Sequence, residues 1–269
     1  GVTGSGKTTT SQKILIESQL PFLVIEPAKT EYRKLFNHLS SDELFIYTLG
    51  SEDFPFRLNP FELIEGERLT AHIDLLKAAF IASFPMEAAM PYILEEAIYE
   101  IYKDKGWNTS TNKNIHKKCP WNSCGDLWPT MSDLLDKLDE VIKSKKFGLE
   151  LESNYRGALI ARFSNLIIGT KGKMLNCKLS TNLYKLIDKR VILELEELKD
   201  SREKSLMMAL ILSRLSVVMK KKHELDSSFK HITLIEEAHR LLSKIEAGDD
   251  GAKKIGVEIF ADILAEIRK

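Results

Sequence analysis

The first 54 residues alternate helical patterns with short apolar runs. Residues 7–19 have helical character, and apolar runs of strand length follow at 22–26 and 44–48. A turn after the first run leads into a second helix that we expect to extend to about residue 39. Strands of a parallel sheet are buried on both faces and therefore have continuous apolar sequences. The alternation predicts an α/β fold with a mainly parallel sheet and helices on both of its faces.

The pattern changes between residues 55 and 148. An extended connector at 55–61 is followed by helical patterns near 69–84, 91–104 and 130–145, with no strand candidate between them. We interpret this region as a helical insertion in the α/β core. Within it, residues 106–129 are a polar stretch without periodicity. Such a stretch predicts a loop that is disordered or faces a partner.

Core-type patterns resume at residue 149. A long apolar helix is expected at 202–222, with Asp200 or Ser201 as its N-cap. The other expected elements are an amphipathic helix at 154–168, a turn at 169–173, strands at 191–195 and 231–237, and a one-faced helix with isoleucines at 255, 259, 263 and 267. The predicted organisation is a core in two parts, 1–54 and 149–269, interrupted by the insertion at 55–148.

Composition narrows the class of protein. The chain has 269 residues, with 39 basic and 39 acidic side chains, so binding of a nucleic acid would need a local basic patch. Its three cysteines, Cys119, Cys124 and Cys177, give no disulfide framework and fit a reducing, cytoplasmic environment. The longest apolar run, residues 206–219, is too short to span a bilayer. We therefore expect a cytoplasmic protein without a membrane span in this chain.

The first eight residues, Gly1 to Thr8, read GVTGSGKT and fit the phosphate-binding loop G-x-x-x-x-G-K-[ST]. Glycines leave backbone N–H groups free to surround a triphosphate, and the following helix directs its positive end at it. Lys7 would reach the β- and γ-phosphates, and the Thr8 hydroxyl would be a Mg²⁺ ligand. The predicted ATP-binding residues are Gly1, Thr3, Gly4, Ser5, Gly6, Lys7, Thr8 and Thr9. The alternative is a glycine-rich turn before a helix.

A second motif would complete such a site. The β-branched apolar run that begins at His231 ends in Glu236 and Glu237. Ligands of α/β sheets collect at the carboxyl ends of strands. We expect Glu236 to hold Mg²⁺ through water and Glu237 to polarise the attacking water. Glu26 is the next candidate base because it also ends a core strand. The alternative is a surface pair of acids at the start of a helix.

The polar stretch at 106–129 contains residue types that can bind a metal. His116, Cys119 and Cys124 lie there, but they supply only three ligands where structural zinc takes four. A loop without metal is therefore the expected structure.

Several stretches resemble the HerA–FtsK-type ATPases, a branch of the RecA-like P-loop motors. The segment EEAH after an apolar strand looks like their acidic motif, and the loop GVTGSGKTTT also looks like theirs. LVIEPAKTEYRKL, RLNPFELIEG and the closing ADILAEIRK are similar to stretches of bacterial HerA-like ATP-binding proteins. The resemblance reaches from one end of the chain to the other.

The resemblance implies an ATPase with a RecA-like core that works as a ring, typically a hexamer, and translocates DNA, often with a nuclease partner. Lys7, Thr8, Glu236 and Glu237 match the ATP site of that family. A neighbouring subunit would supply an arginine, for which Arg162 and Arg156 are candidates by position alone.

Two other functions remain open from the sequence. One is a conjugation or type IV secretion ATPase. The other is an ATP-controlled oligomeric scaffold for a nuclease or another effector, although a catalytic Glu237 would imply turnover. Family members also have a strand before the phosphate loop and one after the last helix. We therefore expect residues 1–269 to be a piece of a longer protein that, alone, is poorly soluble or partly unfolded and lacks ATPase activity.

Overall fold

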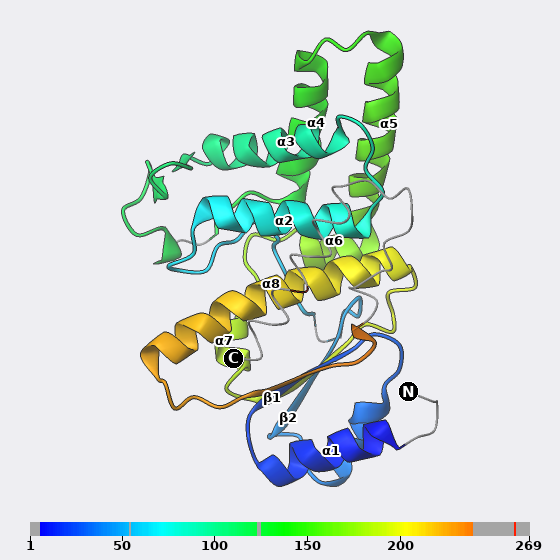
Figure 1. The fold of residues 1–269 in the computed structure, drawn as a ribbon, viewed down its shortest axis with the longest axis vertical. Helices are drawn as coiled ribbons and strands as arrows, with labels where there is room; N and C mark the ends of the chain where they lie inside the picture. The colour runs from blue at the N-terminus through cyan, green and yellow to red at the C-terminus, as the bar shows by residue number, and fades with distance from the viewer. Residues whose placement is uncertain (1–5, 54, 123–124, 239–260, 262–269) are drawn as a thin grey trace.

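The structure is a computed structural model, and it describes residues 6–53, 55–122, 125–238 and 261. Figure 1 shows its layers: a first helix below the sheet, a long helix above the sheet, and a stack of helices above that long helix. The elements are α1 (Lys7–Ser18), β1 (Phe22–Glu26), the 3₁₀ helix η1 (Glu31–Asn37), β2 (Leu44–Thr48), α2 (Leu69–Ser83), α3 (Met90–Asp104), β3 (Trp107–Asn108), β4 (Lys113–Asn114), the 3₁₀ turn η2 (Pro120–Asn122), α4 (Met131–Ser144), α5 (Leu149–Leu166), α6 (Gly169–Leu175), α7 (Leu183–Leu186), β5 (Arg190–Glu194), α8 (Ser201–Leu225) and β6 (Ile232–Ile235).

The main sheet is parallel, with the strand order β2-β5-β1-β6. Its central strands carry the continuous apolar sequences FLVIE and RVILE, and every residue of β1 is buried. This confirms the predicted α/β fold, because only strands covered on both faces have such sequences. The order also places β1, which directly follows α1, between two strands from the last third of the chain.

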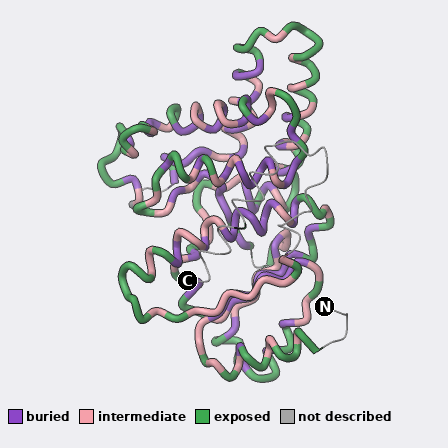
Figure 2. The backbone as a smooth tube through the Cα atoms, in the orientation of Figure 1, coloured by how far each residue is buried: buried purple, intermediate pink, exposed green. Residues whose placement is uncertain are grey.

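Alternate residues of the strands face the two layers. Phe22 and Val24 pack with Leu15 of α1 and Leu35 of η1, and Leu23 and Ile25 belong to the larger core on the other face. That core continues through α8 into the upper helices. Figure 2 shows the buried residues concentrated in the middle of the molecule, where these layers meet.

The upper helices pack on α8 and on each other. α2 lies along α8, α3 contacts α2 and α4, and α4 and α5 form the hairpin at the top of Figure 1. Phe80 of α2 and Phe163 of α5 meet edge to face in this core, with ring centroids 5.0 Å apart. The helices expected at 69–84, 91–104 and 130–145 are confirmed as α2, α3 and α4. The division at residue 148 stays a prediction, and α5, which lies beyond it, packs on α4.

Two local predictions were wrong. The stretch 106–129 is not a structureless loop in its described part: β3 and β4 pair as a small antiparallel hairpin, and Trp107 stacks on Trp128 with centroids 4.8 Å apart. The Trp107 indole N–H donates to the Leu127 carbonyl at 2.8 Å. A few tryptophans among polar residues bury enough apolar area to order the segment without any periodicity.

The predicted turn at 169–173 is instead the start of α6. Its glycines argued against a helix because glycine is a poor helix former. Gly172 is nevertheless required there, since a Cβ atom at this position would lie 2.1 Å from the Ile167 carbonyl oxygen. The predicted helix with isoleucines at 255–267 lies outside the described residues. Among the residues that are described, no helix is long and apolar enough to cross a membrane.

Candidate functional site

A cleft of about 440 Å³ lies where the N-terminus of α1 meets the carboxyl ends of β1 and β6. The residues that line it come from three separate parts of the chain: Gly6, Lys7, Thr8, Thr9, Gln12, Glu26, Ala28, Lys29, Glu31, Lys34, Glu236 and Glu237. Seven of these are Lys or Glu, so the lining is strongly charged. The carboxyl edge of a parallel sheet is where ligands of this fold class bind.

The phosphate-loop residues that the structure describes face this cleft. Gly6 precedes α1 with φ 73°, in the left-handed region that glycine adopts without strain. The helix begins immediately afterwards, so its first N–H groups and Lys7 are at the cleft, where they favour an anion. Thr8 and Thr9 line the same space. The other predicted ATP-binding residues, Gly1, Thr3, Gly4 and Ser5, lie outside the described residues.

The acidic pair enters the cleft from β6. The backbone N–H of Glu236 donates to the Ile25 carbonyl at 3.0 Å, which extends the β1–β6 ladder by one residue. One carboxylate oxygen of Glu236, Oε1, accepts a 2.7 Å hydrogen bond from the Tyr32 hydroxyl. Glu237 is exposed and has φ 53°, a left-handed conformation that is uncommon for a residue with a side chain. Backbone strain of this kind is concentrated at functional sites.

The turn after β1 contributes the buried acid Glu26. Its side chain is only 3% exposed and accepts hydrogen bonds from the backbone N–H groups of Glu31, at 2.7 Å, and Tyr32, at 3.4 Å. Burial raises the pKa of Glu26 to about 7, because the charged form loses more hydration than these two bonds return. The same turn is fixed to α8 by Lys204, whose Nζ donates to the Pro27 carbonyl at 2.5 Å.

Residues 31 to 33 of η1 connect the remaining groups. A hydrogen bond with the Thr8 side chain, followed by one with Lys29, lowers the pKa of Glu31. Burial and the neighbouring Glu236 raise the pKa of Tyr32 above its usual range, so its hydroxyl remains a donor. The Arg33 guanidinium donates two 2.7 Å hydrogen bonds to the fully buried carboxylate of Glu194, and the Thr48 hydroxyl donates to the same carboxylate at 2.8 Å.

These contacts were not predicted from the sequence. The segment LVIEPAKTEYRKL carries part of the family resemblance, but Glu26 is its only side chain for which the sequence predicts a role. One signal was available: the runs FLVIE, VILE and TLIE all end in glutamate, at positions 26, 194 and 236. In a parallel sheet, strands with the same ending can place those acids side by side along one edge.

The two candidate arginines lie elsewhere in this chain. Arg162 is on α5, with Nη1 3.4 Å from the sulfur of Met90, and Arg156 forms an ion pair with Asp139 of α4. Neither lines the cleft, so neither completes it within one subunit. A role in a neighbouring subunit stays a prediction. Cys124 lies outside the described residues, and in the described part of the chain no group of three or more His, Cys, Asp or Glu side chains is arranged to hold a metal.

The cleft residues fit a nucleotide with Mg²⁺. Four glutamates and three lysines line the cleft, so the acids of the cleft leave the lysines little net positive charge for a polyphosphate alone. A hydroxyl such as that of Thr8 and a carboxylate such as that of Glu236 are hard oxygen ligands, which Mg²⁺ prefers. Mg²⁺ is usually bound by one or two such groups together with substrate phosphates, rather than by a full set of protein ligands.

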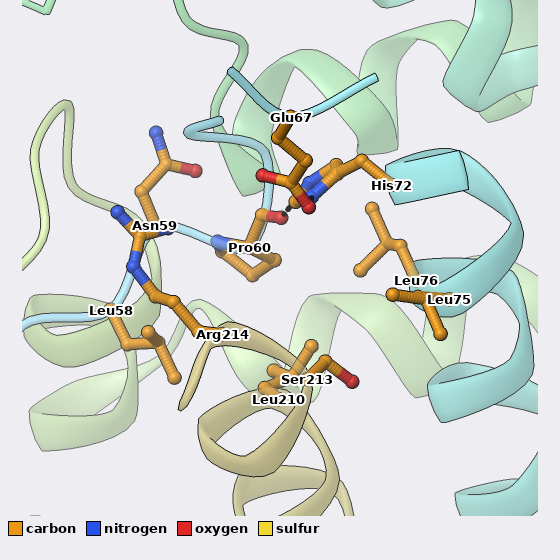
Figure 3. A pocket seen from close by; sticks show the side chains of 10 residues that line it. All are labelled: Leu58, Asn59, Pro60, Glu67, His72, Leu75, Leu76, Leu210, Ser213 and Arg214. Atoms are coloured by element: carbon orange, nitrogen blue, oxygen red, sulfur yellow. Dashed lines mark hydrogen bonds and ion pairs between the residues drawn. The ribbon is translucent and has the colours of Figure 1, made fainter. Parts of the chain in front are cut away.

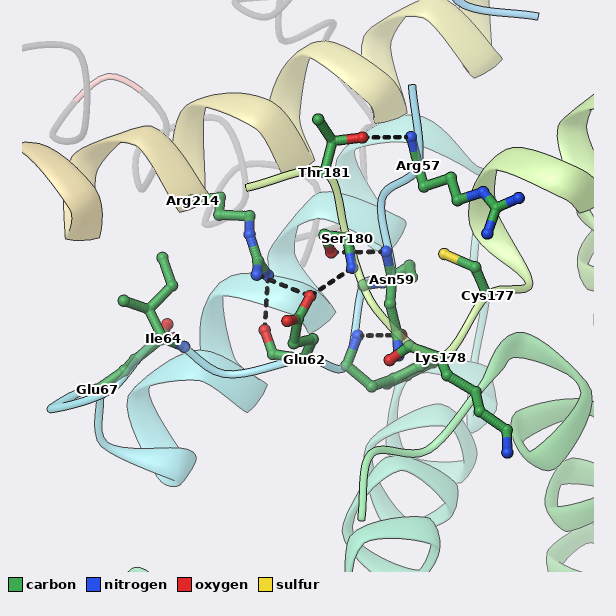
Figure 4. Close-up of polar contacts among 12 residues, drawn as sticks. Arg57, Asn59, Glu62, Ile64, Glu67, Cys177, Lys178, Ser180, Thr181 and Arg214 are labelled. Carbon is green, nitrogen blue, oxygen red and sulfur yellow. Dashed lines mark hydrogen bonds and ion pairs between the residues drawn. The ribbon is translucent and has the colours of Figure 1, made fainter. Parts of the chain in front are cut away.

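A second cluster of polar residues, around the connector that follows β2, is structural. The cavity in Figure 3 has a volume of only about 30 Å³, room for about one water molecule. His72 bridges the Glu67 carboxylate and the Pro60 carbonyl at 2.9 Å each. In Figure 4, Arg214 of α8 donates to the Glu62 carbonyl at 2.6 Å and to its carboxylate at 2.9 Å. These bonds fix the connector between α8 and the upper helices.

Asn59 holds the centre of this cluster. Its side chain is fully buried and donates to the carbonyls of Pro129 and Lys178 at 3.0 and 3.1 Å. The Ser180 hydroxyl, on the facing segment, accepts a hydrogen bond from the Asn59 backbone N–H at 3.0 Å. Buried polar groups that are all satisfied in this way specify a single backbone arrangement.

Comparison with known proteins gives a fold relationship. No protein-family model matches this chain, and no curated protein matches it. Among solved structures, the chain is similar to VirB4 of Thermoanaerobacter pseudethanolicus, with a TM-score of 0.64 and 19% sequence identity. The superposition covers 98% of this chain and 89% of that one. At this level of identity the two share a fold, and the likeness extends through the upper helices as well as the sheet.

Proposed function

We propose that this chain binds and hydrolyses ATP with Mg²⁺ as a subunit of an oligomeric motor. The observation that carries the proposal is the convergence of two motifs some 230 residues apart in sequence: Lys7 and Thr8 line the same cleft as Glu236 and Glu237. Two isolated motifs placed at random in a fold would not share one cleft at the carboxyl edge of the sheet. The fold shared with VirB4 supports the same conclusion.

The residues divide the work as follows. The N-terminus of α1 and Lys7 would hold the phosphates, and Thr8 with Glu236 would hold Mg²⁺, which neutralises charge on the phosphates when bound. Glu237 is exposed at the cleft, so water can reach its carboxylate. It would orient the attacking water and accept its proton, a contribution of about 10²–10⁴-fold to the rate.

Two proposals for the motor differ in the substrate that it moves. The HerA–FtsK resemblance favours translocation of DNA by a ring, a hexamer by family likeness, with a possible nuclease partner. The fold similarity to VirB4 favours a conjugation or type IV secretion ATPase, and it supports that alternative better than HerA. An ATP-controlled scaffold is the third possibility, and the placement of Glu237 in the cleft argues for turnover instead.

The test is nucleotide binding and hydrolysis by the full-length protein and two lysine variants on the same helix. Lys7→Ala removes the cation in the cleft, whereas Lys13→Ala removes an exposed cation that pairs with Glu17 outside it. We expect Lys7→Ala to lose ATP binding and Lys13→Ala to retain it. Equal affinities of all three proteins for ATP would contradict the site. If the site is confirmed, stimulation of hydrolysis by DNA would support the translocase. Absence of stimulation, together with copurification of a membrane channel, would support the secretion ATPase.

A further inference from the structure

Three neighbouring strands end in a glutamate at the same level of the sheet. Glu26 of β1 is in register with Glu194 of β5, and Glu236 follows Ile235 of β6, which is in register with Ile25. A row of three carboxylates therefore runs along the carboxyl edge of the sheet. Like charges side by side are unfavourable, so each of them needs a partner of its own.

Three consecutive residues of η1 supply those partners. The backbone N–H groups of Glu31 and Tyr32 donate to Glu26, the Tyr32 hydroxyl donates to Glu236, and Arg33 donates to Glu194. The segment is thereby fixed across the edge of the sheet. Since Arg33 and the backbone groups already anchor it, the Tyr32–Glu236 bond is not needed for that purpose alone.

The same segment contacts both of the residues that we assign to Mg²⁺. Interaction with the Thr8 side chain lowers the pKa of Glu31, and Glu236 Oε1 accepts a hydrogen bond from the Tyr32 hydroxyl at 2.7 Å. Tyr32 itself is fully buried and is not part of the cleft lining. It does not touch a ligand in the cleft directly, and its hydroxyl acts on the cleft through Glu236.

We propose that Tyr32 is a positioning residue for the metal site: its hydroxyl holds one oxygen of Glu236, which fixes the orientation of the carboxylate toward the cleft. The inference rests on the proposed function, because it assumes that Glu236 serves Mg²⁺. Hydrogen bonds to metal ligands from outside the coordination sphere orient those ligands, and their loss typically weakens metal binding about 10–100-fold. Glu236 is only half-buried, so we expect a loss near the lower limit, about 10-fold.

The test compares Tyr32→Phe with Tyr102→Phe in the full-length protein. Both changes remove one hydroxyl from a fully buried tyrosine, and the Tyr102 hydroxyl donates to the Phe61 carbonyl, away from the cleft. Mn²⁺ is titrated by electron paramagnetic resonance in the presence of a non-hydrolysable ATP analogue, and analogue binding is measured separately in EDTA. We expect Tyr32→Phe to bind Mn²⁺ about 10-fold more weakly, with analogue binding in EDTA unchanged. Tyr102→Phe should match the parent in both measurements.

A double-mutant cycle separates positioning from a general structural effect. If Tyr32 acts through Glu236, Tyr32→Phe has no further effect on Mn²⁺ affinity in a Glu236→Ala background. A further 10-fold loss there, or parental Mn²⁺ affinity in the single Tyr32→Phe variant, overturns the inference while the proposed function stands. A parent that binds no Mn²⁺ with the analogue overturns both.

Discussion

Replacing Glu26 with glutamine should change how the stability of the protein depends on pH. The Glu26 carboxyl group is buried between the sheet and η1, and its pKa is raised from the usual 4.5 to about 7. Glutamine has nearly the same shape, never carries a charge, and keeps an oxygen that can accept the 2.7 Å bond from the Glu31 N–H. Its NH₂ group replaces the oxygen that accepts from the Tyr32 N–H at 3.4 Å, a cost that does not vary with pH. The pH dependence of the difference between the two proteins therefore isolates the protonation of one buried side chain.

The direction of the pH effect on stability follows from how many protons the folded and unfolded states bind. Between about pH 4.5 and 7 the unfolded chain has released the proton of Glu26 while the folded protein retains it. Unfolding thus releases a proton in this range, so a rise in pH favours the unfolded state. The stabilisation is complete below pH 4.5 and is lost as the pH rises through about 7. A tenfold change in proton affinity corresponds to about 1.4 kcal/mol, which gives a loss of about 2–3 kcal/mol between pH 5 and pH 8.

The assay is urea unfolding of the parent and of Glu26→Gln at several pH values from 5 to 8. Other groups titrate in both proteins, so the relevant quantity is the difference between their free energies of unfolding. The parent should lose about 2–3 kcal/mol relative to Glu26→Gln over this range. Tyr102→Phe is the control: the pKa of the buried Tyr102 is raised well above 10, and its difference from the parent should not vary with pH. A difference for Glu26→Gln that is equally constant would refute the reasoning.

Three further predictions concern the cleft and the edge of the sheet. Lys7→Ala should abolish ATP binding in isothermal titration, because it removes the cation directed at the phosphates; unchanged affinity would remove Lys7 from the site. Glu237→Gln should bind ATP normally and hydrolyse it about 10²–10⁴-fold more slowly in a steady-state assay; the parental rate would move the base elsewhere, first to Glu26. Arg33→Ala leaves the fully buried Glu194 without its main partner and should lower the free energy of unfolding in urea by about 2–3 kcal/mol. This is less than the cost of breaking a fully buried ion pair, because Arg33 is 55% exposed. A cost below about 1 kcal/mol would show that Thr48 alone satisfies Glu194.

The sheet was the most predictable part of the fold. The strands expected at 22–26 and 44–48 are β1 and β2 to the residue. The continuous apolar sequence of β1 reflects burial on both faces, whereas β2 is a half-buried edge strand that its short apolar run and flanking turn residues still marked. The β3–β4 hairpin and α6 were missed for different reasons. The hairpin is ordered by contacts among Trp107, Trp121 and Trp128, which have no period. α6 contains two glycines, one of which packs against the preceding chain.

The candidate site was predictable only as far as its motifs. Lys7, Thr8, Glu236 and Glu237 belong to short patterns whose chemistry is local in sequence. The bond from Tyr32 to Glu236 joins residues 204 positions apart, and that from Arg33 to Glu194 joins residues 161 apart. Such pairs depend on strand order, which places β1 between β5 and β6. One sequence does not specify that order, so these contacts appeared only with the fold.

The position of α8 shows how the cleft and the upper helices are connected. Near the start of α8, Lys204 donates a hydrogen bond to the Pro27 carbonyl in the turn after β1. Ten residues later, Arg214 donates to the carbonyl and the carboxylate of Glu62 in the connector. Ten residues of α-helix span about 15 Å. A displacement of the Pro27 turn on nucleotide binding would therefore have to move α8 with it or break the buried Lys204 bond. Because α2 packs along α8, movement of α8 would carry the upper helices as well, and the arrangement favours motion of these layers as one unit.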